Sequence, residues 1–330
     1  MYLDDIRKTP DTIRSTWAFQ HEQQFPEFLK SSRHIWLVGM GASYSACIAA
    51  SYIFRAQGIL AEAELASTML HFTSPSVLPE DCVVLVSQSG ESAETVRLAQ
   101  SLADRNIQRT IAVTNHAESA LAKYSSVVCD MHCTQDDLVS VVTYIASFLV
   151  LKKMALYVSQ QEKSQITPIV VEAERLLNKA EEVANGTIKK TGIPAAITIL
   201  GRGPLLGAAY QAGIVIREVT KIPTSVWEAG DFRHGVIEAL RPDQLTLLFA
   251  IADGPIASLD SALGKRLKQI PGSTLVVGPR NADWPIKASL DFRPILDLLV
   301  VHFLALGLAR VQGITPGVFR WAAHVTRDEG

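Results

Sequence analysis

The sequence predicts an α/β protein made of two copies of one domain, each a parallel sheet flanked by helices on both faces. Short apolar segments alternate with helical segments, which is the pattern of a parallel sheet covered on both sides. The alternation also repeats within the 330 residues, with an offset of 162 positions between the copies. The matching segments are 35–41 with 197–203, 83–86 with 245–248, and 110–113 with 274–277, the last pair two residues out of step. Three strands kept in order indicate a duplicated domain.

Composition and charge limit the class of protein. Hydrophobic residues make up 48% and charged residues 19% of the chain, as in a compact protein with a sizeable core. The net charge of -2 gives no reason to expect a nucleic acid or a membrane as partner. The N-terminus is too polar for a signal peptide, and the longest apolar run, near 298–308, is too short to cross a bilayer. We therefore expect a cytoplasmic protein.

The four cysteines do not indicate a metal site. Cys47 and Cys82 lie in apolar segments and are expected to be small core residues in a reducing compartment. Cys129, His132 and Cys133 lie close together, but no second cluster would complete a set of four ligands. Neither a metal nor another cofactor is expected.

The first half begins with charged helices over residues 1–30, with a helix boundary at Thr9-Pro10. The first domain is expected over 31–165. Its strands are predicted near 35–38, 60–65, 83–86, 110–115 and 127–128. The first strand ends in Gly39-Met40-Gly41, a tight turn that places Ser43 in the first turn of a helix rich in small residues. These two glycines are only half of a dinucleotide fingerprint, so nucleotide binding is disfavoured.

The strand at 83–86 leads into the most informative segment of the first domain, SQSGES at 87–92. It combines three serine hydroxyls with a glycine that allows a sharp turn, and a helix is expected to begin at Glu91. The unpaired N–H groups and partial positive charge of a helix N-terminus suit a phosphate monoester. A plain corner with a serine N-cap would look similar, but three hydroxyls within six residues favour a phosphate site.

An apolar helix is expected around 139–157, within the first domain, followed by a polar linking helix within 166–192; the second domain is expected over 193–330. In this copy the segment 249–252 reads FAIA in place of SQSG, so one phosphate site is expected per chain, in the first domain. Glu218 ends an apolar helix, and His234 follows in the polar loop AGDFRHG. The two side chains suit an acid/base pair. From the residues alone, simpler roles are favoured: an ion pair for Glu218 and a backbone cap for His234.

Taken together, GMGAS at 39–43, SQSGES at 87–92 and Glu218 followed by AGDFRHG resemble the double SIS (sugar isomerase) domain proteins. The closest patterns are the isomerase half of glucosamine-6-phosphate synthase, the SIS-type glucosamine-6-phosphate deaminases and the fructosamine-6-phosphate deglycases. The resemblance extends from about residue 30 to the end of the chain. It implies two tandem SIS domains, with a C-terminal tail that enters the site.

The resemblance also implies a role for particular residues in the chemistry of an open-chain hexose 6-phosphate. Glu218 falls on the family's base, which moves a proton between C1 and C2, and His234 falls on its ring-opening group, contributed across a homodimer interface. A carboxylate suits proton abstraction and imidazole suits proton shuttling near neutral pH. The phosphate would be held far from the reacting carbons. The residues implied in phosphate binding are Ser43, Ser87, Gln88, Ser89 and Ser92.

Two features differ from the pattern of the synthase. The chain begins Met1-Tyr2 without a glutaminase domain, so we do not expect it to take ammonia from glutamine itself. Where family members often carry a lysine near the C-terminus, this chain has His324. A histidine cannot form the stable Schiff base of a lysine, so His324 is expected to act as an acid/base group or to shape the pocket.

The preferred hypothesis is thus a metal-free isomerase or deaminase acting on a phosphorylated sugar, with Glu218, His234 and His324 as catalytic residues. The alternative is a non-catalytic module that binds a sugar phosphate and regulates something else. Such a regulator normally carries a basic helix-turn-helix, for which residues 1–30 are too short and too mixed in charge. The sequence leaves open which sugar phosphate is bound and whether ammonia is released, added or absent.

Overall fold

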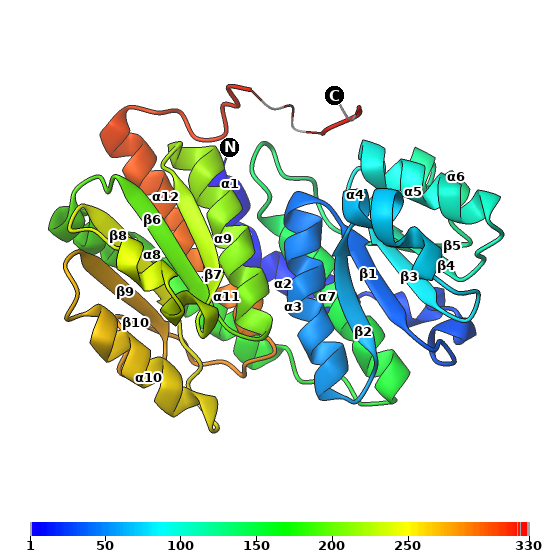
Figure 1. Cartoon of the computed structure of the whole chain (residues 1–330), viewed down its shortest axis with the longest axis horizontal. Coiled ribbons are helices and arrows are strands. Elements are labelled where there is room, and N and C mark those ends of the chain that lie inside the picture. Colours follow the sequence, from blue (N-terminus) through cyan, green and yellow to red (C-terminus); the bar gives the residue numbers. More distant parts are fainter. Residues whose placement is uncertain (1, 322, 324, 329–330) are drawn as a thin grey trace. The chain divides into compact units, whose positions relative to one another are not determined.

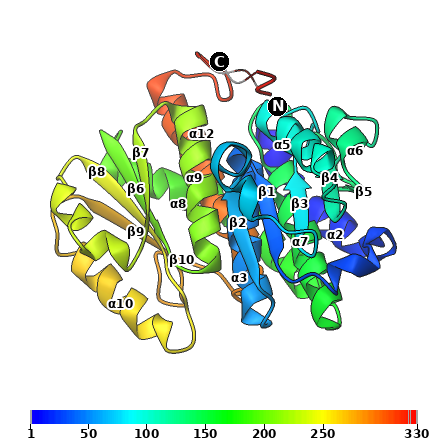
Figure 2. The same cartoon turned by 45° about the vertical axis from the view of Figure 1, so that its right-hand side comes forward.

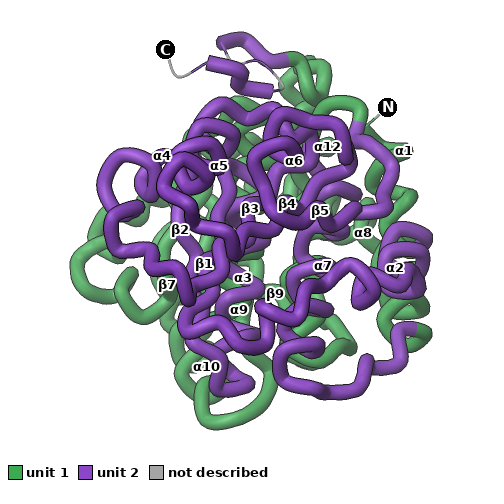
Figure 3. The backbone as a smooth tube through the Cα atoms, turned by 90° about the vertical axis from the view of Figure 1, so that its right-hand side faces the viewer, with its two compact units in different colours: residues 1–10, 137–139, 167–318 green, residues 11–136, 140–166, 319–330 purple. Residues whose placement is uncertain are grey.

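The computed structural model describes residues 2–321, 323 and 325–328, and the chain forms two compact units (Figure 3). The first-sheet unit consists of residues 11–136, 140–166 and 319–330. The second-sheet unit consists of residues 1–10, 137–139 and 167–318. The described residues up to 10 therefore belong to the unit that contains the second sheet, and the described residues from 319 onward belong to the unit that contains the first sheet.

The first sheet has five parallel strands in the order β2-β1-β3-β4-β5, and all five predicted segments form strands. The bounds are β1 Ile35–Gly39, β2 Ala61–Leu65, β3 Cys82–Val86, β4 Thr110–Thr114 and β5 Val127–Asp130. The central strand β3 is buried along its whole length, as expected for an unbroken apolar segment in a parallel sheet.

Helices cover both faces of this sheet (Figure 1 and Figure 2). Val83 and Leu85 are two residues apart in β3 and point to the same face, where Leu98 and Leu102 of α5 pack against them. On the other face α3 lies against β1 and β2, with α7 packed beside it. The helices of this unit are α2 Thr9–Ala18, whose first two residues belong to the second-sheet unit, α3 Gly41–Ala56, α4 Ala66–Thr68, α5 Ala93–Asp104, α6 Ala120–Tyr124 and α7 Val142–Ser159.

The second sheet also has five parallel strands, in the order β10-β9-β8-β6-β7. Its strands are β6 Ala196–Gly201, β7 Thr224–Glu228, β8 Gln244–Phe249, β9 Ser273–Gly278 and β10 Trp284–Pro285. The helices of this unit are α1 Tyr2–Arg7, α8 Thr167–Thr191, α9 Pro204–Thr220, α10 Ile256–Leu267, α11 Arg293–Leu296 and α12 Leu298–Gln312. Leu263 and Leu267 of α10 pack with Leu200 and Leu248 of the sheet, which forms the core on that side.

The strand order confirms the duplicated fold. Read from β7, the second sheet runs β7-β6-β8-β9-β10, which is the order β2-β1-β3-β4-β5 of the first sheet. The register agrees as well, because Gly39 pairs with Leu65 at the end of β1, and Gly201 pairs with Glu228 at the end of β6. The predicted fold class, two tandem α/β domains with parallel sheets, is therefore correct.

Two helical segments are long and apolar enough to cross a membrane, Val142–Ser159 and Arg293–Gln312. The second extends the apolar run that the sequence placed near 298–308, because α11 leads directly into α12. Their most apolar windows are 83% and 89% buried inside the protein, as in the core helices of globular domains. Their hydrophobicity is therefore explained by packing.

Candidate functional site

The predicted phosphate-binding residues lie at the carboxyl end of the first sheet. β1 and β3 are neighbours, and their last residues, Gly39 and Val86, pair with each other. Ser43 follows β1 in the first turn of α3, and Ser87 directly follows β3. Ligands of open α/β sheets bind outside the carboxyl ends of the strands. The fold therefore brings Ser43 to the same sheet edge as the segment 87–92.

The segment 87–92 is held in a compact turn by its own side chains. The backbone N–H of Gly90 donates to the carbonyl and hydroxyl oxygens of Ser87, at 3.1 and 3.2 Å. The N–H of Glu91 donates to the Ser89 hydroxyl at 3.2 Å, and the hydroxyls of Ser87 and Ser92 lie 3.2 Å apart. Each of these hydroxyls keeps further hydrogen-bonding capacity for a ligand.

Only glycine fits at position 90. Its φ of 65° is in the left-handed region, and a Cβ atom there would lie 2.1 Å from the hydroxyl oxygen of Ser119. Ser119 is the N-cap of α6, so Gly90 allows the turn to pack against the start of that helix.

Gln88 presents a buried hydrogen-bond donor at this turn. Its backbone carbonyl accepts hydrogen bonds from the N–H of Asn115 and the hydroxyl of Thr114, both at 3.1 Å, which fixes the peptide. Its side-chain Nε2 is buried and has no hydrogen-bond partner among the described residues. An unsatisfied buried donor costs about 1–3 kcal/mol, a cost that an oxygen of a bound anion would remove.

Helix α5 begins at Ala93, two residues later than the predicted start at Glu91. Ser92 is the N-cap, but its side chain makes no capping bond because the hydroxyl lies next to that of Ser87. The N–H of Ala93 donates to the carbonyl of Thr326 at 3.0 Å, so the C-terminal segment reaches the start of this helix within the first-sheet unit. His324 itself lies outside the described residues.

Glu218 lies in the last turn of α9 in the second-sheet unit. Burial raises the pKa of its carboxyl group to about 7, although the charges of Lys221 and Arg217 lower it. Over the described part of the chain, the carboxylate forms neither an ion pair nor a hydrogen bond. The ion pair that the sequence favoured for Glu218 is therefore absent among the described residues. A carboxyl group with a pKa near neutrality suits a general base.

His234 lies in the loop after β7, at the end of a short 3-10 helix, Asp231–Arg233. Its side chain is exposed, and its backbone N–H donates to the carbonyl of Asp231 at 2.8 Å. The backbone cap that the sequence favoured for its ring is absent from the hydrogen bonds of the described residues. Both Glu218 and His234 belong to the second-sheet unit, whereas the predicted phosphate residues all belong to the first-sheet unit.

The carboxyl end of the second sheet holds a charged cluster that the sequence reasoning missed. Arg202 follows β6 and contacts Glu228, at the end of β7, at 3.2 Å. It also contacts Asp260, a fully buried residue of α10, at 3.1 Å. The signal was present in the duplication, because Arg202 stands where the first copy has Met40.

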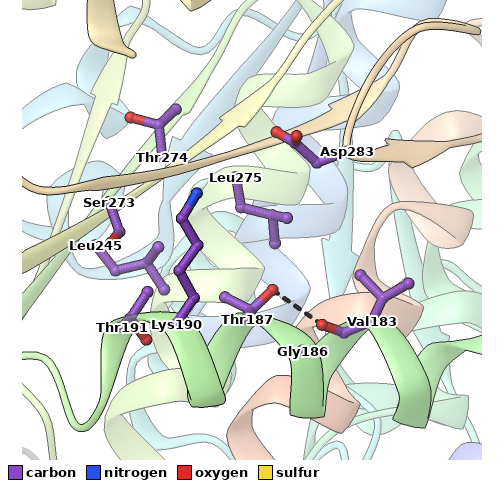
Figure 4. Close-up of a pocket in the computed structure, with 10 residues that line it drawn as sticks. All are labelled: Val183, Gly186, Thr187, Lys190, Thr191, Leu245, Ser273, Thr274, Leu275 and Asp283. Atoms are coloured by element: carbon purple, nitrogen blue, oxygen red, sulfur yellow. Dashed lines mark hydrogen bonds between the residues drawn. The ribbon is translucent and has the colours of Figure 1, made fainter. Parts of the chain in front are cut away.

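Metal ligands do not gather in the described part of the chain, where no group of three or more His, Cys, Asp or Glu side chains is placed to hold an ion. Cys129 is buried, and the Asn115 amide donates to the carbonyl and the sulfur of Cys133 at 3.0 and 3.3 Å. A separate open cavity of about 210 Å³ lies at the amino ends of β8 and β9, beside α8 (Figure 4). It is lined by residues such as Lys190 and Thr274 and contains none of the predicted site residues.

Comparison with known proteins confirms the resemblance. Residues 28–156 match the family model of the SIS domain. The glutamine–fructose-6-phosphate aminotransferase (isomerizing) of Pyrobaculum aerophilum is 22% identical over 334 residues, covering 95% of this chain and 55% of that protein. The chain spans about half of the length of the curated relatives it matches.

Solved structures show the same fold along nearly the whole chain. The crystal structure of glucosamine-6-phosphate deaminase from Thermotoga maritima superimposes with a TM-score of 0.86, at 18% identity, covering 98% of both chains. The C-terminal domain of glucosamine-fructose-6-phosphate aminotransferase from Francisella tularensis gives a TM-score of 0.80, also at 18% identity, covering 96% of this chain and 97% of that one.

Proposed function

We propose that this chain, in which residues 28–156 form a SIS domain, is an enzyme that moves a proton between C1 and C2 of an open-chain hexose or amino-hexose 6-phosphate. The names of its relatives support phosphosugar chemistry: one is an aminotransferase of fructose 6-phosphate, and a structural neighbour is a glucosamine-6-phosphate deaminase. The reaction would be an aldose–ketose isomerisation, coupled to release of ammonia where the substrate is an amino sugar.

The phosphate group would bind at the carboxyl end of the first sheet. In the proposal, the hydroxyls of Ser43, Ser87, Ser89 and Ser92 and the buried amide nitrogen of Gln88 donate to its oxygens. The partial positive charge at the start of α5 adds to the attraction of a dianion. Holding the substrate by its phosphate fixes C1 and C2 without touching the reacting carbons, so binding energy is available to orient the reaction.

The observation that carries the proposal is the state of Glu218. Its carboxyl group is half-buried with a pKa of about 7, and its charge is not neutralised by an ion pair among the described residues. A carboxylate of this kind can take the proton from the carbon next to the carbonyl or imine of the open-chain sugar, which forms an enediol or enamine, and then, as the acid, return the proton to the neighbouring carbon. Proton removal and return on one face need only this single group.

His234 would open the sugar ring. Its exposed imidazole has the proton-shuttling chemistry that ring opening requires near neutral pH. In the proposal it acts in the site of a second copy of the chain, so that the enzyme is a homodimer. His324 is proposed as a further acid/base group near the carbonyl end of the substrate. In the proposal the reaction uses neither a metal nor another cofactor, and it takes place in the cytoplasm.

The test uses proton NMR with a panel of substrates. Glucosamine 6-phosphate is supplied first, and ammonia is followed in the same tube; conversion to fructose 6-phosphate with ammonia release identifies a deaminase. Fructose 6-phosphate in deuterium oxide is supplied next, where exchange at C1 or C2 identifies an isomerase. Binding of these sugar phosphates without release or exchange would contradict the proposal and favour a regulatory sugar-phosphate-binding module.

A further inference from the structure

The two copies of the domain differ at one matched pair of positions. At the carboxyl end of the first sheet, Met40 follows β1 and Leu65 ends β2, so both positions are apolar. At the equivalent positions of the second sheet stand Arg202 and Glu228, which form an ion pair at 3.2 Å. The registers agree, because Gly39 pairs with Leu65 and Gly201 pairs with Glu228. The second copy has therefore exchanged an apolar pair for a charged one at this corner.

The charged pair is anchored in the core of its unit. Nε of Arg202 contacts Asp260 at 3.1 Å, and the Asp260 side chain is fully buried. The other carboxylate oxygen of Asp260 accepts a hydrogen bond from the backbone N–H of Ile251 at 2.9 Å. Arg202 is thus held between two carboxylates, one fixed by the core and one at the end of β7. A guanidinium group suits this bridging because its donors have fixed directions.

Glu228 in turn fixes the loop that carries His234. Its Oε2 accepts hydrogen bonds from the backbone N–H groups of Gly230 and Asp231, the second at 2.8 Å. The carbonyl of Gly230 accepts a hydrogen bond from the N–H of Arg233 at 3.2 Å, and the carbonyl of Asp231 accepts one from the N–H of His234 at 2.8 Å. Gly230 and Asp231, whose N–H groups bond to the Glu228 carboxylate, therefore also fix the backbone of Arg233 and His234 through their carbonyls.

Gly230 makes the close approach of the carboxylate possible. A Cβ atom at this position would lie 2.7 Å from Oε2 of Glu228 and 3.0 Å from Nη1 of Arg202. Charge-assisted hydrogen bonds to backbone N–H groups are also among the stronger hydrogen bonds in proteins. The loop is thus bound to the charged cluster through the N–H groups of Gly230 and Asp231, and the histidine follows three residues after Asp231.

We infer that Glu228, supported by Arg202, is a positioning residue for His234, holding its backbone where the imidazole can serve ring opening. This role rests on the function proposed above. It predicts that losing the carboxylate impairs the step that needs His234 and leaves proton transfer at C1 and C2 intact. Positional errors of about 1 Å in a reacting group cost up to about 100-fold in rate.

The test compares two substrates that differ only in the need for ring opening. Fructose 6-phosphate closes a furanose ring through its 5-hydroxyl, whereas 5-deoxyfructose 6-phosphate cannot and stays open. We expect Glu228→Ala to lower kcat/KM about 10–100-fold on fructose 6-phosphate and less than about twofold on the 5-deoxy analogue. Glu228→Gln keeps an acceptor for the two N–H groups and should recover part of the loss. Arg202→Met should show a smaller loss in the same direction.

Control variants separate the possible outcomes. Arg241→Met removes a guanidinium from an exposed ion pair with Asp243 in the same unit and should leave kcat/KM on both substrates unchanged. Hydrogen exchange at the amides of Gly230 and Asp231 should become faster in Glu228→Ala, and unchanged exchange would overturn the inference without reference to activity. Equal losses on both substrates, or no loss on either, would also overturn it.

His234→Gln distinguishes failure of this inference from failure of the proposed function. If His234→Gln is impaired only on the ring-forming substrate and Glu228→Ala is not, the inference alone is wrong. If the wild-type protein turns over neither of these substrates and does not act on glucosamine 6-phosphate, the proposed function fails and the inference fails with it.

Discussion

Replacing Glu218 by glutamine should make the protein more stable at alkaline pH. Burial raises the pKa of this carboxyl group from 4.5 to about 7, so the folded state binds its proton more tightly than the unfolded chain does. The contribution to the free energy of unfolding is therefore complete below pH 4.5 and is lost as the pH rises through 7. Glutamine does not titrate, so the variant avoids this loss.

The magnitude follows from the size of the pKa shift. One pKa unit corresponds to about 1.4 kcal/mol, so raising the pH from about 5 to about 8 should remove about 2.5 kcal/mol from the wild-type protein relative to Glu218→Gln. Other groups titrate over this range, but their effect is common to both proteins and cancels in the difference. The desolvated carboxylate thus lowers the stability of the unit in which it is proposed to act as base.

Urea-induced unfolding at both pH values gives the difference directly. The control is Glu238→Gln, which replaces an exposed carboxylate of the same unit and should change the free energy of unfolding by less than about 0.5 kcal/mol at either pH. A stability difference between Glu218→Gln and wild type that stays constant from pH 5 to pH 8 would refute the reasoning, because the carboxyl group would then have the same pKa in the folded and unfolded states.

Three further substitutions test the fold and the phosphate site. Gly90→Ala should lower the free energy of unfolding by about 2 kcal/mol or more and weaken sugar-phosphate binding, because the new Cβ would lie 2.1 Å from the Ser119 hydroxyl at a φ of 65°. Unfolding and binding curves of the variant that match those of the wild-type protein would contradict this. Arg293→Met should lower the free energy of unfolding by about 3–5 kcal/mol, because it leaves the fully buried Asp297 carboxylate without its ion pair; an unchanged urea midpoint would show that Asp297 needs no partner. Ser87→Ala should weaken binding of fructose 6-phosphate about tenfold by calorimetry while stability changes by less than about 1 kcal/mol, and equal affinity would remove Ser87 from the phosphate site.

The fold could be predicted from the sequence because its information is local and repeated. Apolar segments such as 83–86 and 245–248 must be buried, and their equal spacing in the two halves revealed the duplication. The start of α5 was placed two residues early because Glu91 is compatible with a first helical turn, whereas its carboxylate instead accepts the N–H of Ala120 at 3.1 Å. Such contacts between distant residues leave no periodic signal.

The candidate site could be predicted in its residue types but not in its interactions. The hydroxyls of the segment 87–92 and the glutamate of α9 stand out in the sequence, yet the buried position of the Gln88 Nε2 and the raised pKa of Glu218 depend on the fold. The cluster of Arg202, Glu228 and Asp260 joins three elements that are far apart in the chain. Only the comparison of Arg202 with Met40 in the first copy hinted at it.

The central claim is that Glu218 is the base for proton transfer between C1 and C2. The most direct measurement is exchange at these carbons in deuterium oxide for the wild-type protein and Glu218→Gln, together with calorimetric binding of the same sugar phosphate to both. We predict exchange by the wild-type protein, no measurable exchange by Glu218→Gln, and equal binding by the two. Exchange by Glu218→Gln at the wild-type rate, or loss of binding together with exchange, would contradict this role.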